Sequence, residues 1–589
     1  MRALALLALL VAPCGAFFHG AAPGWGLAPR GGGAQLTGEI KECRELGELA
    51  RILQEQSGML NRIHVSAAWV CLARIGRGGG AESTVVLTSL QDQTREVLDQ
   101  MGAREIANMM YSIGRISQIG IKPDRELLEA IQTRATATVG EFIPQHVANV
   151  MWALATMGEK ADRGLLTAMQ TRATATAVEF APQAVSNLVW ALATMGEKAD
   201  RGLLEAMQSR ATATAGEFKP QEGTNLLWAL AKMGERADLW LLEAMQRRAT
   251  ATAGEFVPQD VANLLWALAT MRERADRGLL MAMVVRATAR AENFKPQEVS
   301  NLLWSLAAMG EKADRGLLDA MQTRATSTVE RFKPQEVANL LWALATMGEK
   351  VDPGLLEAMQ RRATSIAGGF KPQEVTNMLW ALAVMGGGLD GSLAVLVDCL
   401  APRILELRDQ FTQAENSQLH QWLLSCELGL ASGASLPEGV ARVKLEIGEE
   451  CLQAFSGQAT HESRLQRDVA TALKRCAGLE VEIEEEFHDA RSGYSIDVLV
   501  RRRSAAGSTG GAKALEEPAA GWAVEVDGPS HFLVDGRTPN GSTILKRRQL
   551  EQLGYTVVPV PFLEWQALRG EEAQKGYLED KLRRASMVD

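Results

Sequence analysis

Paired cysteines are missing from this sequence of 589 residues. The cysteines number seven, stand far apart and form no Cys-x-x-Cys motif, so the sequence offers neither a disulfide framework nor a zinc site. We interpret them as reduced thiols that serve as small apolar residues. The mature protein is therefore expected to work in a reducing compartment.

The sequence also lacks an excess of positive charge and has few aromatic residues. The formal net charge is −9, so no global basic field indicates a nucleic-acid partner, and only a local basic surface could bind one. Aromatic side chains make up 5% of the residues, whereas 47% apolar and 23% charged residues are ordinary for a globular protein. A chain of this length is too long for one hydrophobic core and needs several cores or one extended solenoid.

Acidic residues are missing from the N-terminus before Glu39. Arg2 precedes an apolar run, Ala3 to Val11, which has the shape of a secretory signal and is too short to span a bilayer as a mature helix. The next stretch is rich in Gly, Ala and Pro, as in a transit peptide. A signal followed by Phe17 resembles the bipartite presequence of algae with secondary plastids. We therefore predict a presequence over residues 1–36 and a chloroplast location, with the mitochondrion as the alternative and no membrane attachment in the mature form.

One motif recurs through the middle of the chain. A tryptophan stands every 38 residues, and the copy over residues 333–348 reads Lys-Pro-Gln-Glu-Val-Ala-Asn-Leu-Leu-Trp-Ala-Leu-Ala-Thr-Met-Gly. Such a period predicts a solenoid of stacked repeats. The tryptophans of the copies are Trp152, Trp190, Trp228, Trp266, Trp304, Trp342 and Trp380.

Each copy predicts a pair of helices. Pro334 suits the first position of a helix, and Gly348 suits the left-handed residue just past its end. Apolar residues between them recur at the i, i+3, i+4, i+7 spacing, and the tryptophan lies with alanines on a second apolar flank, which predicts a core position for it. A second helix then begins at an aspartate cap and completes a hairpin that must stack on its neighbours. The aspartates are Asp162, Asp200, Asp238, Asp276, Asp314 and Asp352.

Weaker copies flank the array. Residues 105–114 match the first helix, with Tyr111 in the tryptophan position, and the stretches around Trp69 and Trp422 are more distant copies. Divergent ends are what a solenoid needs to cap its core. We therefore predict degenerate helical repeats over residues 37–103, the main array over 104–400, a helical cap or linker over 401–456 and a distinct domain over 457–589.

The polar edge of the first helix is a candidate binding surface. Gln335, Asn339, Ala343 and Thr346 fall on one edge, and the asparagine recurs in every copy. Stacked amides can pair with the edges of single-stranded bases. Alternatively, they bond to neighbouring backbone inside the stack. The asparagines are Asn149, Asn187, Asn225, Asn263, Asn301, Asn339 and Asn377.

Two further features accompany this edge. The residues one and three positions before the asparagine vary between copies, which is what sequence-selective reading requires and also what drift at tolerant positions produces. A column of arginines on the second helix could track a phosphate backbone. Because the copy over residues 295–332 has five basic and five acidic residues, these arginines could equally lie along the core with their charged ends in water. They are Arg172, Arg210, Arg248, Arg286, Arg324 and Arg362.

The motif Pro-Gln-x-Val-x-Asn-Leu-Leu-Trp-Ala-Leu-Ala resembles the octotricopeptide repeat of algal organelle proteins. The resemblance covers about residues 104–400. It implies a mostly α protein, a right-handed α-solenoid of 38-residue hairpins, that binds single-stranded organellar RNA and governs its stability, processing, splicing or translation. These copies are more alike and less basic than we would expect in an array that recognises a particular RNA sequence.

The C-terminal region changes character. A helix is predicted over residues 463–473, strands over 494–500, 522–526 and 555–560, and a helix over 543–553, with a flexible excursion over 504–520. Three stretches resemble the RAP domain: Val524 to Phe532, the Lys546-Arg-Arg-Gln-Leu run, and Gly554 to Pro561. That resemblance implies a small α/β, restriction-endonuclease-like fold that binds RNA.

The resemblance to the restriction-endonuclease-like fold implies catalytic roles for five residues. Asp497 and Glu525 would face Mg²⁺ if the domain cleaves RNA, and His531 would act as acid or base. The expected lysine is replaced by Asp527, and Lys546 is a substitute from the helix. A non-catalytic relic of that fold is the favoured interpretation. Basic clusters for phosphate are Arg501, Arg502, Arg503, Lys546, Arg547 and Arg548, followed by Arg583 and Arg584.

The sequence therefore predicts an organellar RNA-binding protein that acts in post-transcriptional control, requires no cofactor and works by occupancy alone. Other organelle gene-expression proteins are candidate partners. Two alternatives stay open: an endoribonuclease that is targeted by the repeats, and a protein-binding helical scaffold.

Overall fold

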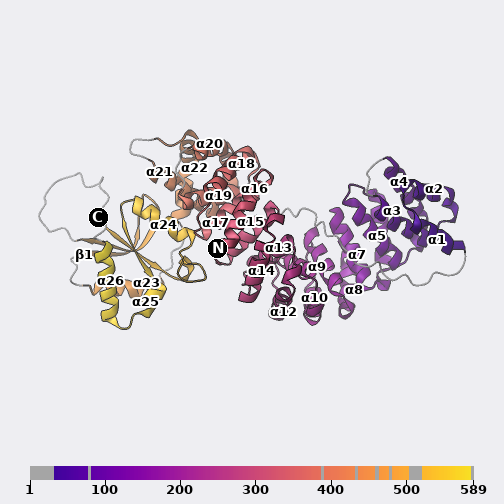
Figure 1. The fold of residues 1–589 in the computed structure, drawn as a ribbon, viewed down its shortest axis with the longest axis horizontal. Helices are drawn as coiled ribbons and strands as arrows, with labels where there is room; N and C mark the ends of the chain where they lie inside the picture. Colours follow the sequence, from indigo (N-terminus) through magenta and orange to yellow (C-terminus); the bar gives the residue numbers. More distant parts are fainter. Residues whose placement is uncertain are drawn as a thin grey trace. The chain divides into compact units, whose positions relative to one another are not determined.

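We describe the fold from a computed structural model, which defines residues 32–76, 81–386, 391–430, 435–457, 463–476, 481–502 and 521–585 (Figure 1). Most of the predicted presequence lies outside these residues. Contacts divide the chain into two compact units, Met1–Arg286 and Ala287–Asp589, which are described separately. No described helix has both the length and the apolar character required to cross a membrane.

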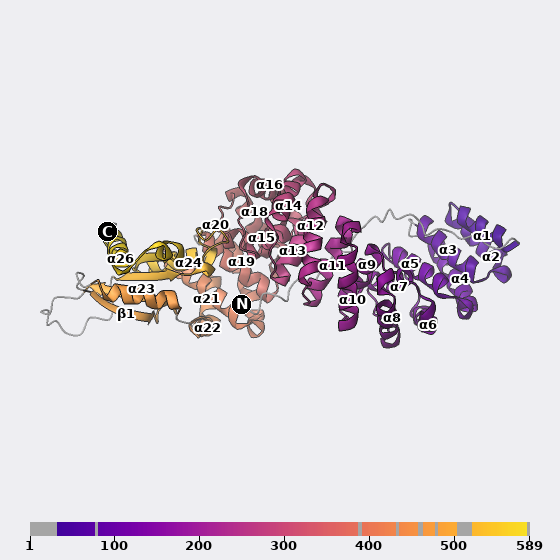
Figure 2. The same cartoon turned by 90° about the horizontal axis from the view of Figure 1, so that it is seen from below.

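The first unit consists of paired helices. Its helices are α1 (Gly32–Glu42), α2 (Leu46–Glu55), α3 (Arg62–Ile75), α4 (Ala81–Val97), α5 (Ala103–Ser117), α6 (Arg125–Ala137), α7 (Pro144–Met157), α8 (Arg163–Ala175), α9 (Pro182–Met195), α10 (Arg201–Ala213), α11 (Pro220–Met233), α12 (Leu239–Ala251), α13 (Pro258–Met271) and α14 (Arg277–Ala289), the last of which crosses the boundary. First helices pack on first helices and second helices on second helices, as a solenoid requires (Figure 2).

The ends of these helices lie at the proline, glycine and aspartate residues that the sequence predicted. Pro144 is the first residue of α7, and Gly158 follows its end in the left-handed conformation at φ 74°. Arg272 holds the same conformation at φ 62° in the copy that lacks this glycine. The Asp162 carboxylate caps α8 by accepting the Leu165 N–H at 2.8 Å.

Glutamines of the second helices tie each copy to the next. The Gln132 side-chain oxygen accepts the Asp162 N–H at 2.9 Å, and Gln170 accepts the Asp200 N–H at 2.7 Å. Because the acceptor is buried in each case, leaving it unpaired would be costly. Each bond fixes the N-terminus of one second helix against the body of the preceding one.

The second unit continues the array and adds an α/β domain. Its helices are α15 (Pro296–Ala308), α16 (Arg315–Ser327), α17 (Pro334–Thr346), α18 (Pro353–Ser365), α19 (Pro372–Met385), α20 (Gly391–Glu406), α21 (Gln413–Leu428), α22 (Glu438–Ser456), α23 (Arg464–Lys474), α24 (Gly541–Gln552), α25 (Phe562–Ala567) and α26 (Glu571–Ala585), and its strands are β1 (Val481–His488), β2 (Ser495–Arg502), β3 (Trp522–Asp527) and β4 (Thr556–Pro561). A mostly α repeat array followed by a small α/β domain is thus confirmed.

The four strands lie in the order β1-β2-β3-β4. The β1–β2 and β2–β3 pairs are antiparallel, and β3 and β4 are parallel, joined by α24. Strand β1 was not expected from the sequence, although Val481, Ile483 and Phe487 stand in the same alternating phase.

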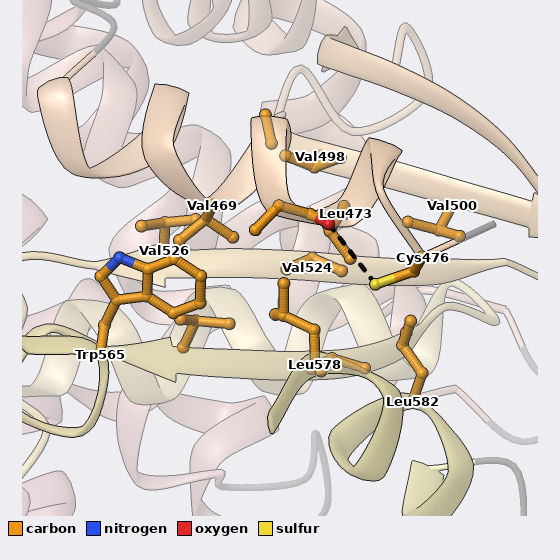
Figure 3. Packing of buried hydrophobic residues seen from close by; sticks show 14 residues of the cluster. Val469, Leu473, Cys476, Val498, Val500, Val524, Val526, Trp565, Leu578 and Leu582 are labelled. Carbon is orange, nitrogen blue, oxygen red and sulfur yellow. Dashed lines mark hydrogen bonds between the residues drawn. The ribbon is translucent and has the colours of Figure 1, made fainter. Parts of the chain in front are cut away.

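The sheet has a hydrophobic core on each face. Helices α23 and α26 cover one face, where Val469, Leu473, Val524 and Leu578 pack together (Figure 3). On the other face, α24 contributes Leu550, and Leu424 from the repeat helix α21 packs into the same cluster. The last repeat helices therefore complete the core of the α/β domain. The domain boundaries given above stay predictions.

Candidate nucleic-acid interface

The first helices expose one narrow polar stripe. In α9, Gln183, Asn187, Trp190 and Thr194 are partly exposed, and every other residue of the helix is buried. Their i, i+4, i+7, i+11 spacing places them on one helix face. We call this face of each first helix, with the equivalent four positions, the amide stripe.

The amide stripe corrects the edge expected from the sequence. Ala343 was expected on that edge, but it is fully buried, and Trp342 lies there instead between Asn339 and Thr346. The tryptophans thus border the asparagines. Their predicted core packing is confirmed for Trp152, Trp228, Trp266 and Trp380, which are at most 9% exposed. The other three tryptophans are half-buried.

Tryptophans of successive copies lie close to one another. The Trp228 and Trp266 rings have centroids 6.4 Å apart in the first unit, as do Trp304 and Trp342 in the second. Tyr111 stands in the same relation to Trp152 at 5.1 Å. The stripe therefore combines amide groups with partly or largely buried aromatic rings.

Most of the asparagine amides have no partner within the described parts of the chain. Asn149, Asn187, Asn225, Asn263, Asn301 and Asn339 are half-buried, and their side chains make no hydrogen bond there. Asn377 differs, since it is buried and its oxygen accepts the Gln418 amide at 3.0 Å. Internal bonding of the amides, the alternative considered above, therefore applies to Asn377 alone among the seven.

The two variable positions beside the asparagine differ in their exposure. The nearer position is at most 1% exposed in every copy, for example Ser186 and Thr224. The farther position is a capping residue where it is glutamate, because the Glu298 carboxylate accepts the Lys295 N–H at 2.9 Å. Burial raises the pKa of Glu298 above its ordinary value, an effect shared by Glu222, Glu336 and Glu374. Burial of the nearer position argues against selective reading there. Reading by the farther position stays a prediction.

The arginine column joins neighbouring copies. The Arg172 Nε donates to the Phe142 carbonyl at 2.7 Å, and Arg324 bonds to Phe294 in the same way at 2.7 Å. The full set of donors is Arg172, Arg210, Arg248, Arg286, Arg324 and Arg362. Each guanidinium thus has a structural role that sequence reasoning did not assign. Contact of these arginines with phosphate stays a prediction.

The α/β domain gathers the predicted acid, histidine and lysine residues beneath α24. Lys546 Nζ lies 2.5 Å from a Glu525 carboxylate oxygen, and Glu525 is 2% exposed. Asp527 pairs with Arg547 at 2.5 Å and with His531 at 3.3 Å. The Asp497 carboxylate accepts the Val526 N–H at 2.7 Å. We call these residues the acid–lysine cluster.

Burial dominates the ionisation of this cluster. It raises the pKa of Glu525 to about 7, although the charge of Lys546 opposes the shift. It likewise raises the pKa of Asp497. For Asp527, burial is outweighed by His531 and Arg547, which hold its pKa below the ordinary value.

The acid–lysine cluster does not fit a Mg²⁺ site as it is arranged. Mg²⁺ needs converging oxygen ligands, whereas Glu525 and Asp527 already face Lys546 and Arg547. Over the described residues, no group of three His, Cys, Asp or Glu side chains is placed to hold a metal ion. We therefore derive no reaction step through a metal here.

The predicted basic clusters are largely engaged within the protein. Arg501 pairs with Glu484 at 2.8 Å, and Arg548 donates to the carbonyls of Ala383 and Val384 in α19. Arg502 ends β2, and Arg503 lies outside the described residues. Contact of these residues with RNA stays a prediction.

The α/β domain also contacts the ends of three successive first helices, which the sequence did not indicate. The Val534 N–H donates to the carbonyl of Gly310, which follows α15, at 2.8 Å. Gly541, the first residue of α24, lies so close to α17 that a Cβ there would stand 2.3 Å from the Ala345 carbonyl oxygen. Arg548 covers the turn after α19 at Gly386. The glycines after these helices, Gly310, Gly348 and Gly386, are 38 residues apart, so the domain is set in register with the repeat.

A hydrogen-bonded chain links the array to the acid–lysine cluster. Trp380 Nε1 donates to Gln421 at 3.1 Å, and the Gln421 amide donates to the Tyr494 hydroxyl at 3.0 Å. Tyr494 in turn donates to Gln549 of α24 at 2.6 Å, and Lys546 lies 6.0 Å from the centre of the Tyr494 ring. The last amide stripe and the cluster are thus parts of one connected structure.

Comparisons with known proteins agree with both regions. The family model described as RNA-editing substrate-binding complex 6 protein matches residues 40–238 and again 238–417, and the RAP domain model matches residues 524–581. A RAP domain-containing protein, chloroplastic, from Oryza sativa subsp. japonica is 45% identical over 56 residues, which are 10% of this chain and 9% of that protein. A chain from a homology model of the full-length AP-3 complex in an intermediate open conformation aligns over 76% of this chain and 81% of its own length, at 9% identity and a TM-score of 0.28, too low to carry an argument.

Proposed function

This chain belongs to the family described as RNA-editing substrate-binding complex 6 protein, and from this premise we propose that it binds single-stranded organellar RNA along the amide stripe. The observation that supports the proposal most is the row of unbonded asparagines beside the tryptophans on successive first helices. The chloroplast is the proposed compartment, in keeping with the chloroplastic relative of the RAP domain.

The chemistry of the amide stripe suits bases better than phosphates. An asparagine amide both donates and accepts, as the edge of an unpaired base requires, and an aromatic ring edge offers apolar contact beside it. The stripe of α9 consists of Gln183, Asn187, Trp190 and Thr194 and has no charge. In α11 a cation joins it, since Lys232 lies 4.8 Å from the Trp228 ring centre. Single-stranded RNA exposes such base edges, whereas a duplex hides them.

Occupancy of the transcript is sufficient for a role in RNA stability, processing, splicing or translation. A bound solenoid shields RNA from nucleases or keeps a segment unpaired without any chemical step. We do not extend the proposal to RNA cleavage, because Glu525 and Asp527 are buried and paired with cations. The RAP domain adds a second RNA-binding surface to the proposal.

The test uses the full-length mature chain and a randomised pool of single-stranded RNA 30-mers as the probe. The Asn187→Ala, Asn225→Ala, Asn263→Ala triple variant should bind the pool about a hundredfold more weakly, since each lost hydrogen bond is worth about 1 kcal/mol. Its thermal unfolding should not change, because these amides bond to nothing in the described structure.

Asn377→Ala is the matched control. It removes the bond to Gln418 and should lower stability while leaving RNA affinity near that of the wild type. Wild-type affinity in the triple variant would contradict the proposal. A protein partner that co-purifies from the organelle without RNA would instead support the scaffold alternative.

A further inference from the structure

Two second helices of the first unit carry an exposed apolar patch. Leu239 and Trp240 begin α12 and are 64% and 70% exposed, and Met281 and Val285 on α14 are 60% and 67% exposed. Helices α12 and α14 lie side by side in both ribbon views (Figures 1 and 2). We call these four residues the outer patch. Large apolar side chains exposed together are typical of interaction sites.

The outer patch is a departure from the repeat. Where α12 begins Leu239-Trp240, the second helices α8, α10, α14 and α16 begin with Arg-Gly. The position of Met281 is otherwise held by Thr167, Glu205, Glu243, Asp319 and Glu357, and that of Val285 by Thr171, Ser209, Arg247, Thr323 and Arg361. Four polar or small positions have thus become apolar in two neighbouring copies, so the feature does not belong to the packing that all copies share.

One of these substitutions removes the acidic partner of an arginine beside the patch. In α10, Arg201 pairs with Glu205 at 2.8 Å, but the equivalent partner of Arg277 is Met281. Arg236, Arg274 and Arg277 are exposed and make no ion pair within the described residues.

Several nearby carboxylates are already engaged. Asp238 and Asp276 cap their helices at 2.8 Å from the Leu241 and Leu279 N–H groups, and Glu243 lies 3.7 Å from Arg247. Glu235 and Glu273 are the remaining acids of the adjoining loops. Free arginines therefore flank the apolar side chains at the N-terminal ends of α12 and α14.

We infer that the outer patch binds an amphipathic helix of a partner protein, with apolar residues at i, i+3, i+4 and i+7 and acidic residues beside them. The groove between two neighbouring helices such as α12 and α14 can accept a third helix by ridges-into-grooves packing. Three of the four patch residues are aliphatic, which favours a protein ligand over stacked bases. A second copy meeting through the same patch would bring like-charged arginines together, which disfavours self-association.

The experiment uses the full chain and a labelled synthetic helical peptide with leucines at that spacing and glutamates on its flanks. A second peptide carries lysine in place of each glutamate. The acidic peptide should bind the wild type at least about tenfold more tightly than the lysine peptide. Equal binding of both peptides, or of neither, would overturn the inference.

The matched variant restores the residues of the other copies through Leu239→Arg, Trp240→Gly, Met281→Glu and Val285→Thr. It should lose affinity for the acidic peptide by at least about tenfold while keeping its thermal midpoint and its affinity for the RNA pool. Unchanged peptide binding would contradict the inference. Loss of RNA affinity would assign the patch to RNA, and a concentration-dependent dimer that this variant abolishes would assign it to a second copy; either result overturns a partner helix. The RNA-binding proposal is tested separately by the asparagine variants.

Discussion

The copies of the first unit and those next to the α/β domain have nearly the same sequence but different surroundings. Gly158, Gly196 and Gly234 end their first helices at φ 71–75°, and a Cβ added at any of them would meet no atom of the described residues within 4 Å. Gly310, Gly348 and Gly386 hold the same turn at φ 67–76°, yet each is in contact with the α/β domain. A generic feature of the repeat has therefore become a specific docking surface through residues elsewhere in the chain.

The docking uses groups that every first helix offers. The last carbonyls of a helix have no partner within it and carry partial negative charge. Arg548 supplies donors to two such carbonyls, and the absence of a side chain at Gly541 lets α24 approach another. The specificity of the contact thus resides in the α/β domain.

The largest effect is expected from Gly541→Ala. The new Cβ would stand 2.3 Å from the Ala345 carbonyl oxygen and 3.1 Å from the Thr346 Cα, backbone atoms that cannot rotate away. We expect the free energy of unfolding to fall by about 3 kcal/mol in urea titration, with faster hydrogen exchange in α24. Gly576→Ala in α26, where a Cβ meets no atom of the described parts of the chain within 4 Å, should be neutral or stabilising. Equal effects of the two changes would refute the close docking of α24.

Arg548→Met should have the next largest effect. Two carbonyls would lose a charged donor, which costs about 2 kcal/mol. The matched change Arg172→Met removes the bond to the Phe142 carbonyl in a copy of the first unit. We call the copies of the first unit open and those in contact with the α/β domain covered. Hydrogen exchange should rise in α19 and α24 for the first variant and in α7 and α8 for the second. Exchange that rises in the same helices for both would contradict the separation between covered and open copies.

A stabilising change is expected within the open copies. Gly223 replaces the valine of other copies in α11 and borders a small cavity lined by Leu227, Met245 and Phe256. A Cβ there would make ordinary contact with the Met245 sulfur at 3.5 Å. Gly223→Ala should therefore raise stability by about 1 kcal/mol, the usual difference between the two residues inside a helix, as read from the thermal midpoint. A lower midpoint would show that the cavity has another use.

The smallest effect concerns pH. Burial raises the pKa of Glu374 above its ordinary value of 4.5, so its contribution to stability is fully present below that value and is lost as pH rises through the raised pKa. Glu374→Gln keeps a bond to the Lys371 N–H without the buried charge. The variant should lose less stability than the wild type as pH rises above 4.5, by under about 1 kcal/mol. Glu222→Gln in an open copy should behave alike, and parallel pH profiles for wild type and both variants would contradict the burial effect.

The array could be predicted from the sequence because its period, caps and apolar spacing are local. Pro144, Gly158 and Asp162 occupy the positions that helix-end chemistry requires. The contact of Arg172 with the Phe142 carbonyl could not be predicted, because it joins residues 30 positions apart and its acceptor is backbone. The docking of α24 joins residues about 165 positions apart, as in the Arg548–Ala383 bond, and no spacing in one sequence reports it.

The central claim is that RNA lies along the amide stripe of the first helices. Ultraviolet crosslinking of the full chain to the randomised single-stranded pool, with mass spectrometry of the crosslinked peptides, tests it most directly. We expect crosslinks in α7, α9, α11 and α13, at or beside Trp152, Trp190, Trp228 and Trp266. Crosslinks confined to the second helices or to residues 481–585 would contradict it.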